Sequence, residues 1–211
     1  MLLAFDTATA QIGVAVLDPG TGRVLSELAD DRPMKHGERL APLIREALAA
    51  AGVDRGDLTG IAVGAGPGPF TGLRVGLVTA RTLGHVLGIE VHAVCTLDVI
   101  AGEAAQLLGL SFTVATDARR KEVYLATYDA DGRRLGGPEV RRPADIAAET
   151  AAAPTAGVGA VLYPETFSHP VGPNRPSAAW LGRLVCAGRV DLLDPEPLYL
   201  RRPDAVERVP R

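Results

Sequence analysis

Residues 1–29 read MLLAFDTATAQIGVAVLDPGTGRVLSELA, and this stretch decides the fold. It holds three apolar runs with the length and composition of β-strands, at Leu2–Phe5, Ile12–Leu17 and Val24–Ala29. A short polar turn (DTAT, residues 6–9) separates the first two runs, and an Asp-Pro-Gly turn (residues 18–22) separates the last two. Connections this short join antiparallel neighbours, so the stretch predicts a three-stranded antiparallel meander.

Helices and strands alternate through the rest of the first half. An apolar stripe at helical spacing predicts a helix over Glu38–Ala51, and Gly52 stands where a C-terminal cap is expected. Two strands and two further helices are predicted at Ile61–Gly64, Val91–Val94, Leu73–Leu87 and Leu97–Leu108. The order of elements is therefore β-β-β-α-β-α-β-α.

The second half repeats this pattern in a shortened form. Its predicted strands are Leu110–Thr116, Val123–Tyr128, Arg134–Arg142 and Val158–Leu162, and its predicted helices are Pro143–Ala152 and Ser177–Gly188. Residues 194–211 are rich in proline and charge and are predicted to be extended. With a boundary near Gly109, the sequence predicts a first domain over 1–109 and a degenerate second domain over 110–211 that ends in the extended tail.

Composition sets limits on the class of protein. The chain has 211 residues, of which 47% are hydrophobic and 22% charged, as in an ordinary globular protein. No apolar run approaches the ~18–20 residues that span a bilayer, and the N-terminus lacks the basic segment of a signal peptide. Cys95 and Cys186 cannot form a disulfide framework, which favours a reducing cytoplasm. The net charge of −3 argues against wrapping nucleic acid by bulk electrostatics and leaves a local basic patch open.

The glycine–proline stretch GAGPGPFTG, residues 64–72, joins a predicted strand to a predicted helix. Backbone amides in such a loop can bind an anion, but the chain has no Gly-Lys of a P-loop and no G-x-G-x-x-G fingerprint here. The alternative is a stiff connection in which Thr71 caps the helix. The residues assigned to this structural loop are Gly66, Pro67, Gly68, Phe70, Thr71 and Gly72.

Each half also has a carboxylate at the end of its first strand. Asp6 is followed by Thr7 and Thr9, and Asp117 is followed by Arg119. Two such groups could hold a metal–nucleotide between the halves. The alternative is that Asp and Thr simply cap their turns.

The helix after the loop has one face without bulk, because small residues recur every four positions at Gly72, Gly76, Ala80 and Gly84. Another backbone can approach such a face closely. Two interpretations stay open: the face packs on the chain's own sheet, or it docks a helix of another chain.

No hydrolytic or metal-binding constellation is present in the sequence. The four histidines form no H-x-x-x-H pair, and neither cysteine lies in a C-x-x-C motif. A G-x-S-x-G nucleophile elbow is also absent.

Six blocks in this order resemble the TsaB (YeaZ) family and together cover nearly the whole chain. They are DTAT (6–9), HGERLAPLI (36–44), GPGPFTGLRVGL (66–77), DARRKEVYLATYD (117–129), GVGAVLYPETF (157–167) and PLYLRRPDA (197–205). One departure is Pro69, where the family pattern has serine, so a hydroxyl contact there would be lost.

The resemblance implies an actin-like/hexokinase/Hsp70 ATPase fold of two ribonuclease-H-like lobes, the second shortened. It implies a part in forming N6-threonylcarbamoyladenosine at the adenosine 3′ of the anticodon, in tRNAs that read codons beginning with A. The paralogous TsaD subunit carries an H-x-x-x-H metal pair, and Thr96 and Ile100 stand at the matching positions here. Isoleucine cannot ligate a metal. The resemblance therefore implies a non-catalytic subunit that holds no metal.

The same resemblance implies the partners. The chain would form a heterodimer with TsaD through helices 38–51 and 73–87, join the ATPase TsaE, meet tRNA through the complex, and form a homodimer when alone. No cofactor would be bound tightly, and ATP or ADP would be contacted at a subunit interface. The residues assigned to the partner interface are Leu40, Leu43, Ala47, Leu73, Gly76, Leu77, Ala80, Leu83 and Gly84.

Two alternatives from the enzyme class remain. A small ATP-dependent kinase or ATPase of the same fold would use Asp6 and Asp117 around magnesium. A protease is the weaker alternative, because the metal pair and the nucleophile elbow are both missing.

Overall fold

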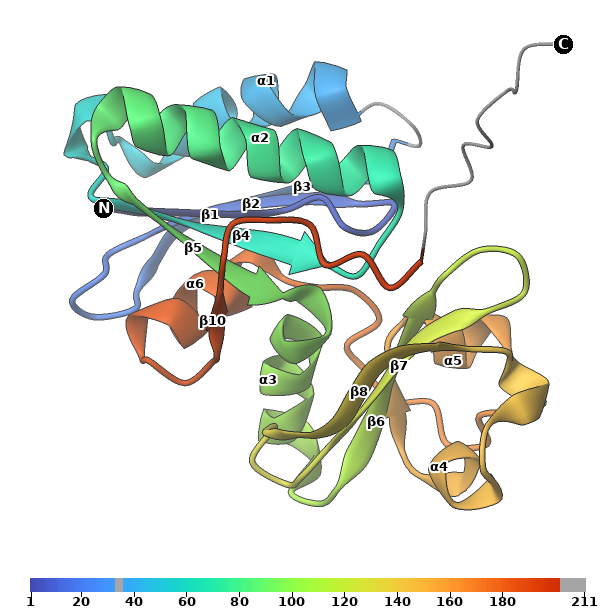
Figure 1. Ribbon diagram of the computed structural model, residues 1–211. Coiled ribbons are helices and arrows are strands. Elements are labelled where there is room, and N and C mark those ends of the chain that lie inside the picture. The colour runs from blue at the N-terminus through green and yellow to red at the C-terminus, as the bar shows by residue number, and fades with distance from the viewer. Residues whose placement is uncertain (33–35, 202–211) are drawn as a thin grey trace, which may run out of the picture.

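Two β-sheets organise the structure, a computed structural model that describes residues 1–32 and 36–201 (Figure 1). The first sheet has the strand order β10-β5-β4-β1-β2-β3, and the second has the order β8-β7-β6-β9. The mixed α/β class and the element order predicted for the first half are confirmed.

The first sheet begins with the predicted meander. Strands β1 (Leu2–Asp6), β2 (Ile12–Leu17) and β3 (Val24–Asp30) are antiparallel neighbours. Strand β4 (Gly60–Gly66) pairs in parallel with β1, and β5 (Glu90–Cys95) pairs in parallel with β4. The meander prediction is therefore confirmed.

Helices cover both faces of this sheet, so β1 is buried along its whole length (Figure 1). Leu3 and Phe5 pack in one core cluster with residues of α1 (His36–Ala51) and α2 (Phe70–Leu87). Successive side chains of a strand point to opposite faces, so Leu2 and Ala4 pack in another cluster with residues of α6. None of the helices in the described residues combines the length and the apolar character that crossing a bilayer requires.

The second sheet is smaller. Its strands are β6 (Phe112–Asp117), β7 (Val123–Tyr128), β8 (Arg134–Arg141) and β9 (Thr155–Ala156). Helix α3 (Thr96–Leu108) links the two sheets and shares a core cluster with β6 and β7. The short elements of the chain are η1 (Arg55–Asp57), η2 (Pro143–Asp145), α4 (Ala148–Ala152) and α5 (Val158–Leu162).

The prediction of a strand at Val158–Leu162 is wrong, because this segment is helix α5. A short apolar run cannot be assigned to helix or strand by periodicity alone. Residues 155–156 already pair with β6 as β9, and the following segment turns onto the face of the sheet. There Gly159 lies so close to Ala115 that a Cβ would be 2.8 Å from the Cβ of that alanine.

The end of the chain returns to the first sheet. Helix α6 (Ala178–Cys186) packs on β1 and β2, and β10 (Leu192–Leu193) pairs antiparallel with β5. The predicted boundary near residue 109 places α6 and β10 in the second domain, whereas both elements lie on the first sheet. Residues 194–201 have no regular secondary structure, and the rest of the predicted tail, 202–211, lies outside the described residues.

Candidate functional site

The turn after β1 lies where the carboxyl ends of the parallel strands meet the start of α3, the usual position of ligand sites in α/β sheets. Asp6 is 1% exposed there. Its Oδ1 accepts a hydrogen bond from the Ala8 amide at 2.7 Å, and its Oδ2 accepts one from Thr96 Oγ1 at 2.7 Å. The Gly66 amide donates to the same threonine hydroxyl at 3.3 Å. One carboxylate thus joins the ends of β1, β4 and the beginning of α3.

Burial is the main influence on the pKa of this carboxyl group. Desolvation raises the pKa of Asp6 above its ordinary value, while the hydrogen bonds from Thr96 and Ala8 and the nearby His36 act in the opposite direction. The raised pKa makes Asp6 a less favourable anion than an exposed aspartate.

The glycine–proline loop lies directly on this turn. A Cβ at Gly68 would collide with the Ala8 carbonyl, and one at Gly72 would collide with the Thr7 carbonyl. Thr7 Oγ1 donates to the Gly72 carbonyl at 2.8 Å. The strand-end carboxylate is therefore enclosed by the chain's own backbone.

The assignment of Thr71 as the cap of α2 is wrong. The helix begins at Phe70, its capping position is Pro69, and no side chain caps it. Gly66 has a φ of 96°, a conformation that glycine adopts readily, and the Gly66–Pro67 bond is cis. The loop thus joins β4 to α2 with proline rather than threonine at the helix start.

The small-residue face of α2 packs on the chain itself. A Cβ at Gly76 would collide with Thr7 Oγ1, and one at Gly84 would lie 2.5 Å from Val91 Cγ2. Buried side chains are covered already and cannot meet a partner in this packing. This corrects the interface assignment: the eight buried members are Leu40, Leu43, Ala47, Leu73, Gly76, Leu77, Ala80 and Gly84.

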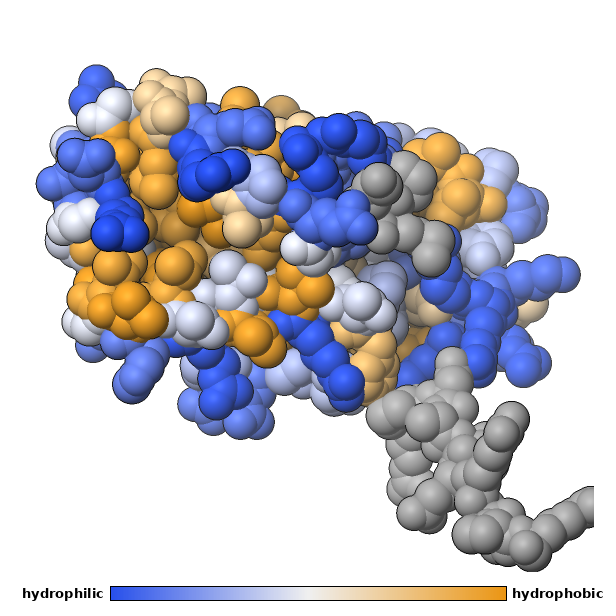
Figure 2. Space-filling view, turned by 90° about the horizontal axis from the view of Figure 1, so that it is seen from above, coloured by the Kyte–Doolittle hydropathy of each residue, from blue (hydrophilic) through white to orange (hydrophobic). Residues whose placement is uncertain are grey.

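Leu83, the remaining residue of the predicted partner interface, is partly buried against the core cluster that contains Leu3 and Phe5. The outer face of α2 is different, because Val78 is 62% exposed and Val86 is 71% exposed. Figure 2, which views the α1–α2 side from above, shows hydrophobic side chains at the surface over this lobe.

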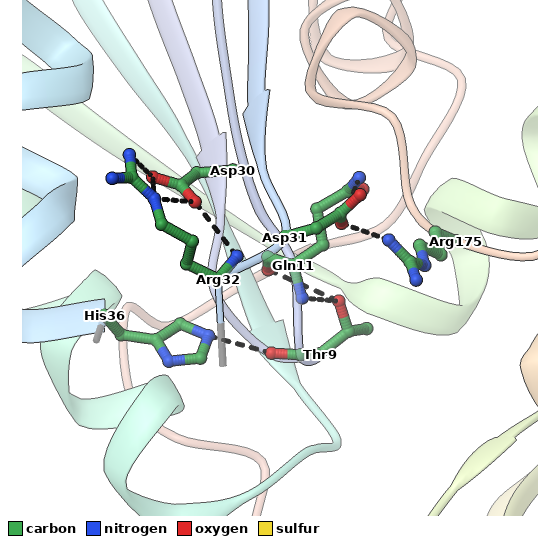
Figure 3. Close-up of polar contacts among 7 residues, drawn as sticks. All are labelled: Thr9, Gln11, Asp30, Asp31, Arg32, His36 and Arg175. Carbon is green, nitrogen blue, oxygen red and sulfur yellow. Dashed lines mark hydrogen bonds and ion pairs between the residues drawn. The ribbon is translucent and has the colours of Figure 1, made fainter. Parts of the chain in front are cut away.

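Polar contacts hold the turn from the outside (Figure 3). His36 Nε2 lies 2.9 Å from the Thr9 carbonyl oxygen, and Gln11 Nε2 donates to Asp31 Oδ1 at 3.0 Å. Asp31 in turn pairs with Arg175, which comes from the second half of the chain. Thr9, which the sequence predicts as a nucleotide contact, takes part in these contacts through its carbonyl oxygen.

Asp117 and Arg119 lie in the second lobe, at the end of β6. Arg119 Nη1 is 3.2 Å from Asp117 Oδ2, and the Arg119 amide donates to Asp117 Oδ1 at 2.7 Å. No hydrogen bond or ion pair within 1–32 and 36–201 joins Asp117 to Asp6. Tyr124, on the neighbouring strand, donates instead to the Gly68 carbonyl at 3.4 Å. The two carboxylates are not brought into contact.

The segment 194–201, which we name the strap, connects the two lobes. The Leu198 amide donates to the Ala65 carbonyl at 2.9 Å, and the Tyr199 ring stacks on Phe70 at 4.1 Å between centroids. Arg74 Nε donates to the Tyr199 hydroxyl at 2.9 Å. Beyond the tyrosine, Arg201 donates to the Ala118 carbonyl at 2.9 Å and pairs with Glu122. Local sequence patterns do not predict these contacts, although the PLYLRRPDA block begins in this segment.

Thr96 and Ile100, which the resemblance matches to the two histidines of the H-x-x-x-H motif, have other roles here. Thr96 binds Asp6, and Ile100 is fully buried in the core. Over the part of the chain that the structure describes, no three His, Cys, Asp or Glu side chains lie close enough together to hold a metal ion.

Comparisons with known proteins find related sequences over most of the chain. Residues 27–170 match the family described as TsaD, tRNA N6-adenosine threonylcarbamoyltransferase. An uncharacterized protein of Mycobacterium tuberculosis is 44% identical over 97% of this chain and 93% of its own length. The tRNA threonylcarbamoyladenosine biosynthesis protein TsaB of Haemophilus influenzae is 32% identical over 79% of this chain and 70% of its own.

A solved structure, YeaZ from Pseudomonas aeruginosa, superposes with a TM-score of 0.76 at 31% identity and covers 94% of this chain and 99% of its own. The prediction of an actin-like ATPase fold with two lobes is therefore confirmed.

The contact between α2 and the turn can be tested by replacing Gly76 with alanine. The added Cβ meets Thr7 Oγ1, and this overpacking should lower the free energy of unfolding by ~1–3 kcal/mol. The better helix propensity of alanine should offset about 1 kcal/mol of that loss. Removing the hydroxyl as well, in Gly76→Ala/Thr7→Ala, should cost less than the two single changes together, with a coupling of at least ~0.5 kcal/mol in urea unfolding. Thr82→Ala, on the exposed face, should stay within ~0.5 kcal/mol. Strict additivity would contradict the contact.

The burial of Asp6 predicts a pH dependence of stability. Because its folded pKa is raised above the unfolded value of ~3.9, the folded state binds more protons between the two values, and stability falls as the pH rises through this window. We expect Asp6→Asn to lack this decline when the two proteins are unfolded in urea between pH 4 and pH 8. Thr96→Val, which removes a donor to the carboxylate, should steepen the decline. Parallel curves for wild type and Asp6→Asn would rule out the burial effect.

Proposed function

The chain belongs to the TsaB (YeaZ) family, and from this membership we propose that it is the non-catalytic partner of a TsaD-type transferase. The pathway makes N6-threonylcarbamoyladenosine at the adenosine 3′ of the anticodon, in tRNAs that read codons beginning with A. The transferase moves the threonylcarbamoyl group from its adenylate to tRNA, and the ATPase TsaE joins the pair. The complex acts in the cytoplasm.

The observation that carries this proposal concerns the start of α3. Residues 27–170 match a transferase family, and the resemblance implies that Thr96 and Ile100 stand at the positions of its H-x-x-x-H metal pair. The threonine hydroxyl is used to bind Asp6, and the isoleucine lies in the core with no exposed surface. Neither side chain has a free ligand atom to offer, so the metal-dependent step belongs to the partner.

The partner surface we propose is the outer face of α2, at Val78, Thr82 and Val86. These residues are four apart and share one side of the helix, and the two valines are 62% and 71% exposed. The matched region 27–170 contains both α1 and α2. A TsaD chain would therefore present equivalent helices, and two related chains can pair about a pseudo-twofold axis. A second copy of this chain would occupy the same face when TsaD is missing.

We also propose that this chain alone does not bind ATP or ADP tightly and that any nucleotide is contacted at a subunit interface. The close approach of Gly68 to Ala8 and of Gly72 to Thr7 supports this, because the loop backbone packs directly on the turn that follows Asp6. The kinase alternative requires Asp6 and Asp117 to share a metal–nucleotide, whereas Asp6 is bound to Ala8 and Thr96 and Asp117 is paired with Arg119.

Reconstitution tests the function. Unmodified tRNA, TsaD and TsaE of the same organism, threonylcarbamoyl-adenylate and ATP are incubated with and without this chain. The modified nucleoside is then measured by mass spectrometry after digestion. We expect product only when the chain is present. Full product in its absence would overturn the proposal.

The partner face can be tested with Val86→Arg. Burying an unpaired guanidinium in an apolar contact is strongly unfavourable, so we expect the dissociation constant of the pair with TsaD to rise at least tenfold, with loss of a joint peak in size-exclusion chromatography with light scattering. Leu107→Arg is the matched control, because Leu107 is also 71% exposed but lies on α3. If both variants pair normally, α2 is not the interface.

Nucleotide binding separates the partner role from the kinase alternative. In isothermal titration calorimetry we expect no ATP binding tighter than ~1 mM by the isolated chain with magnesium, a limit that corresponds to about −4 kcal/mol. ATP turnover by the isolated chain that Asp6→Ala abolishes would favour the kinase instead.

A further inference from the structure

A cavity of about 590 Å³ lies between the two lobes, among residues that the proposed function does not use. Its floor is α3, with Asp98 and Gly102, and one wall is the turn between β7 and β8. The other wall is the end of α6 and the segment that leads to β10. Figure 1 shows α3 between α6 and the β7–β8 hairpin. The volume falls in the range of ~300–1,000 Å³ that small-molecule sites occupy, and such sites often form where domains meet.

Close packing on α3 fixes both walls of the cavity. A Cβ at Gly102 would lie 2.7 Å from Leu184 Cδ1, so α6 rests directly on α3. A Cβ at Gly132 would lie 3.1 Å from the Ala105 Cβ, so the β7–β8 turn rests on α3 as well. Asp129 Oδ1 accepts hydrogen bonds from two amides of the same turn, at 2.8 and 3.0 Å. The cavity is therefore formed before a ligand enters, which lowers the entropy cost of binding.

A buried charged pair lies in the floor of the cavity. Asp98 is 8% exposed, and its Oδ1 accepts a hydrogen bond at 2.8 Å from the hydroxyl of Tyr128, which is fully buried. Arg134 Nη2 lies 3.5 Å from Asp98 Oδ2, farther than the ~2.7–2.9 Å of a strong charge-assisted hydrogen bond. A guanidinium has five N–H donors, and each carboxylate oxygen can accept more than one hydrogen bond. Both groups therefore keep hydrogen-bonding capacity for a ligand.

The charged groups around the cavity have both signs. Among the described residues, the charged ones that line it are Asp98, Asp131, Asp191, Arg133, Arg134 and Arg189. A simple anion placed here would lie near carboxylates, and a simple cation would lie near guanidinium groups, and like charges brought together are costly. A molecule that carries one charge of each sign can place each charge beside an opposite one. The lining therefore favours a zwitterion.

The end of α6 adds apolar surface to the cavity. Leu184 is 7% exposed, Trp180 is half-buried, and both line the cavity. The guanidinium of Arg183 lies 5.3 Å from the centroid of the Trp180 ring, a cation–π contact that helps to hold the indole in place. A ligand that covers this surface carries an apolar side chain beside its two charged groups.

We propose that this cavity binds a free α-amino acid with an apolar side chain. The carboxylate of the ligand meets the guanidinium groups of Arg134 and Arg189, its ammonium group meets the carboxylates of Asp98 and Asp191, and its side chain packs on Trp180. Because the walls belong to both lobes, the bound amino acid stabilises their present arrangement. This inference goes beyond the partner role of the chain and does not depend on it.

L-leucine is the probe, with two compounds that each lack one of its charges. Isocaproate has the same alkyl chain without the ammonium group, and isoamylamine has it without the carboxylate. Binding to the isotope-labelled full chain is followed by heteronuclear NMR. We expect L-leucine to shift the amide signals of Gly102, Gly132 and Gly188, which line the cavity, with a Kd of about 1 mM or lower. Isocaproate and isoamylamine should bind roughly tenfold more weakly or worse, because each loses one set of charged hydrogen bonds.

Two variants test the residues. Arg189→Gln/Asp191→Asn removes one charge of each sign from exposed positions, so we expect an unchanged melting temperature and a Kd for L-leucine that rises roughly tenfold. Asp98→Asn keeps the shape of the side chain in the floor and should also weaken binding. Arg45→Gln/Glu46→Gln is the matched control, because it makes the same change of charge at exposed positions of α1, on the opposite face of the first sheet. It should bind L-leucine as the wild type does.

The outcomes are decisive even if Asp98→Asn fails to fold, because the exposed double variant remains. Absence of shifts at the three glycine amides with L-leucine at ~10 mM would overturn the inference. Equal affinity for L-leucine, isocaproate and isoamylamine would also overturn it, as would equal weakening by both double variants. Each of these results leaves the proposed function standing, since pairing with TsaD and nucleoside formation are measured separately. Failure of the reconstitution would overturn the proposed function and not this site.

Discussion

The buried carboxylate of Asp6 is the constraint on which the rest of the structure depends. A buried polar group is costly without hydrogen-bond partners, and here the partners come from the Ala8 amide and the Thr96 hydroxyl. Because Thr96 is the first residue of α3, this bond fixes the start of that helix against the end of β1. The Gly66 amide adds the end of β4 to the same junction. One side chain thereby sets the relative positions of three elements.

The junction also determines which face of α2 is buried and which is exposed. With the loop seated on the turn at Gly68 and Gly72, the small-residue face of α2 must lie inward, against Thr7. The opposite face, with Val78 and Val86, is then left exposed. An enclosed carboxylate and an exposed apolar helix face are the two features on which the proposed partner role rests.

The chain connects the two lobes twice after β9. Helix α6 and β10 pack on the first sheet, and the strap then crosses to the β6–β7 turn. Tyr199 stacks on Phe70 at one end of this crossing, and Arg201 meets Ala118 and Glu122 at the other. The β6–β7 turn is thus tied to the loop of the first lobe.

The sequence by itself determined the local structure and the family. Apolar runs and turn residues predicted the meander and the first-half order, because strand and helix periods are local properties. Periodicity shows which residues share a face but cannot show what covers it, so the partner of the Gly76 face, which is Thr7 of the same chain, was decided only by tertiary structure. The same holds for Val158–Leu162, where the run fits both periods and packing on Ala115 made it a helix. The return of α6 and the contacts of Tyr199 depend on residues more than a hundred positions apart, which no local pattern encodes.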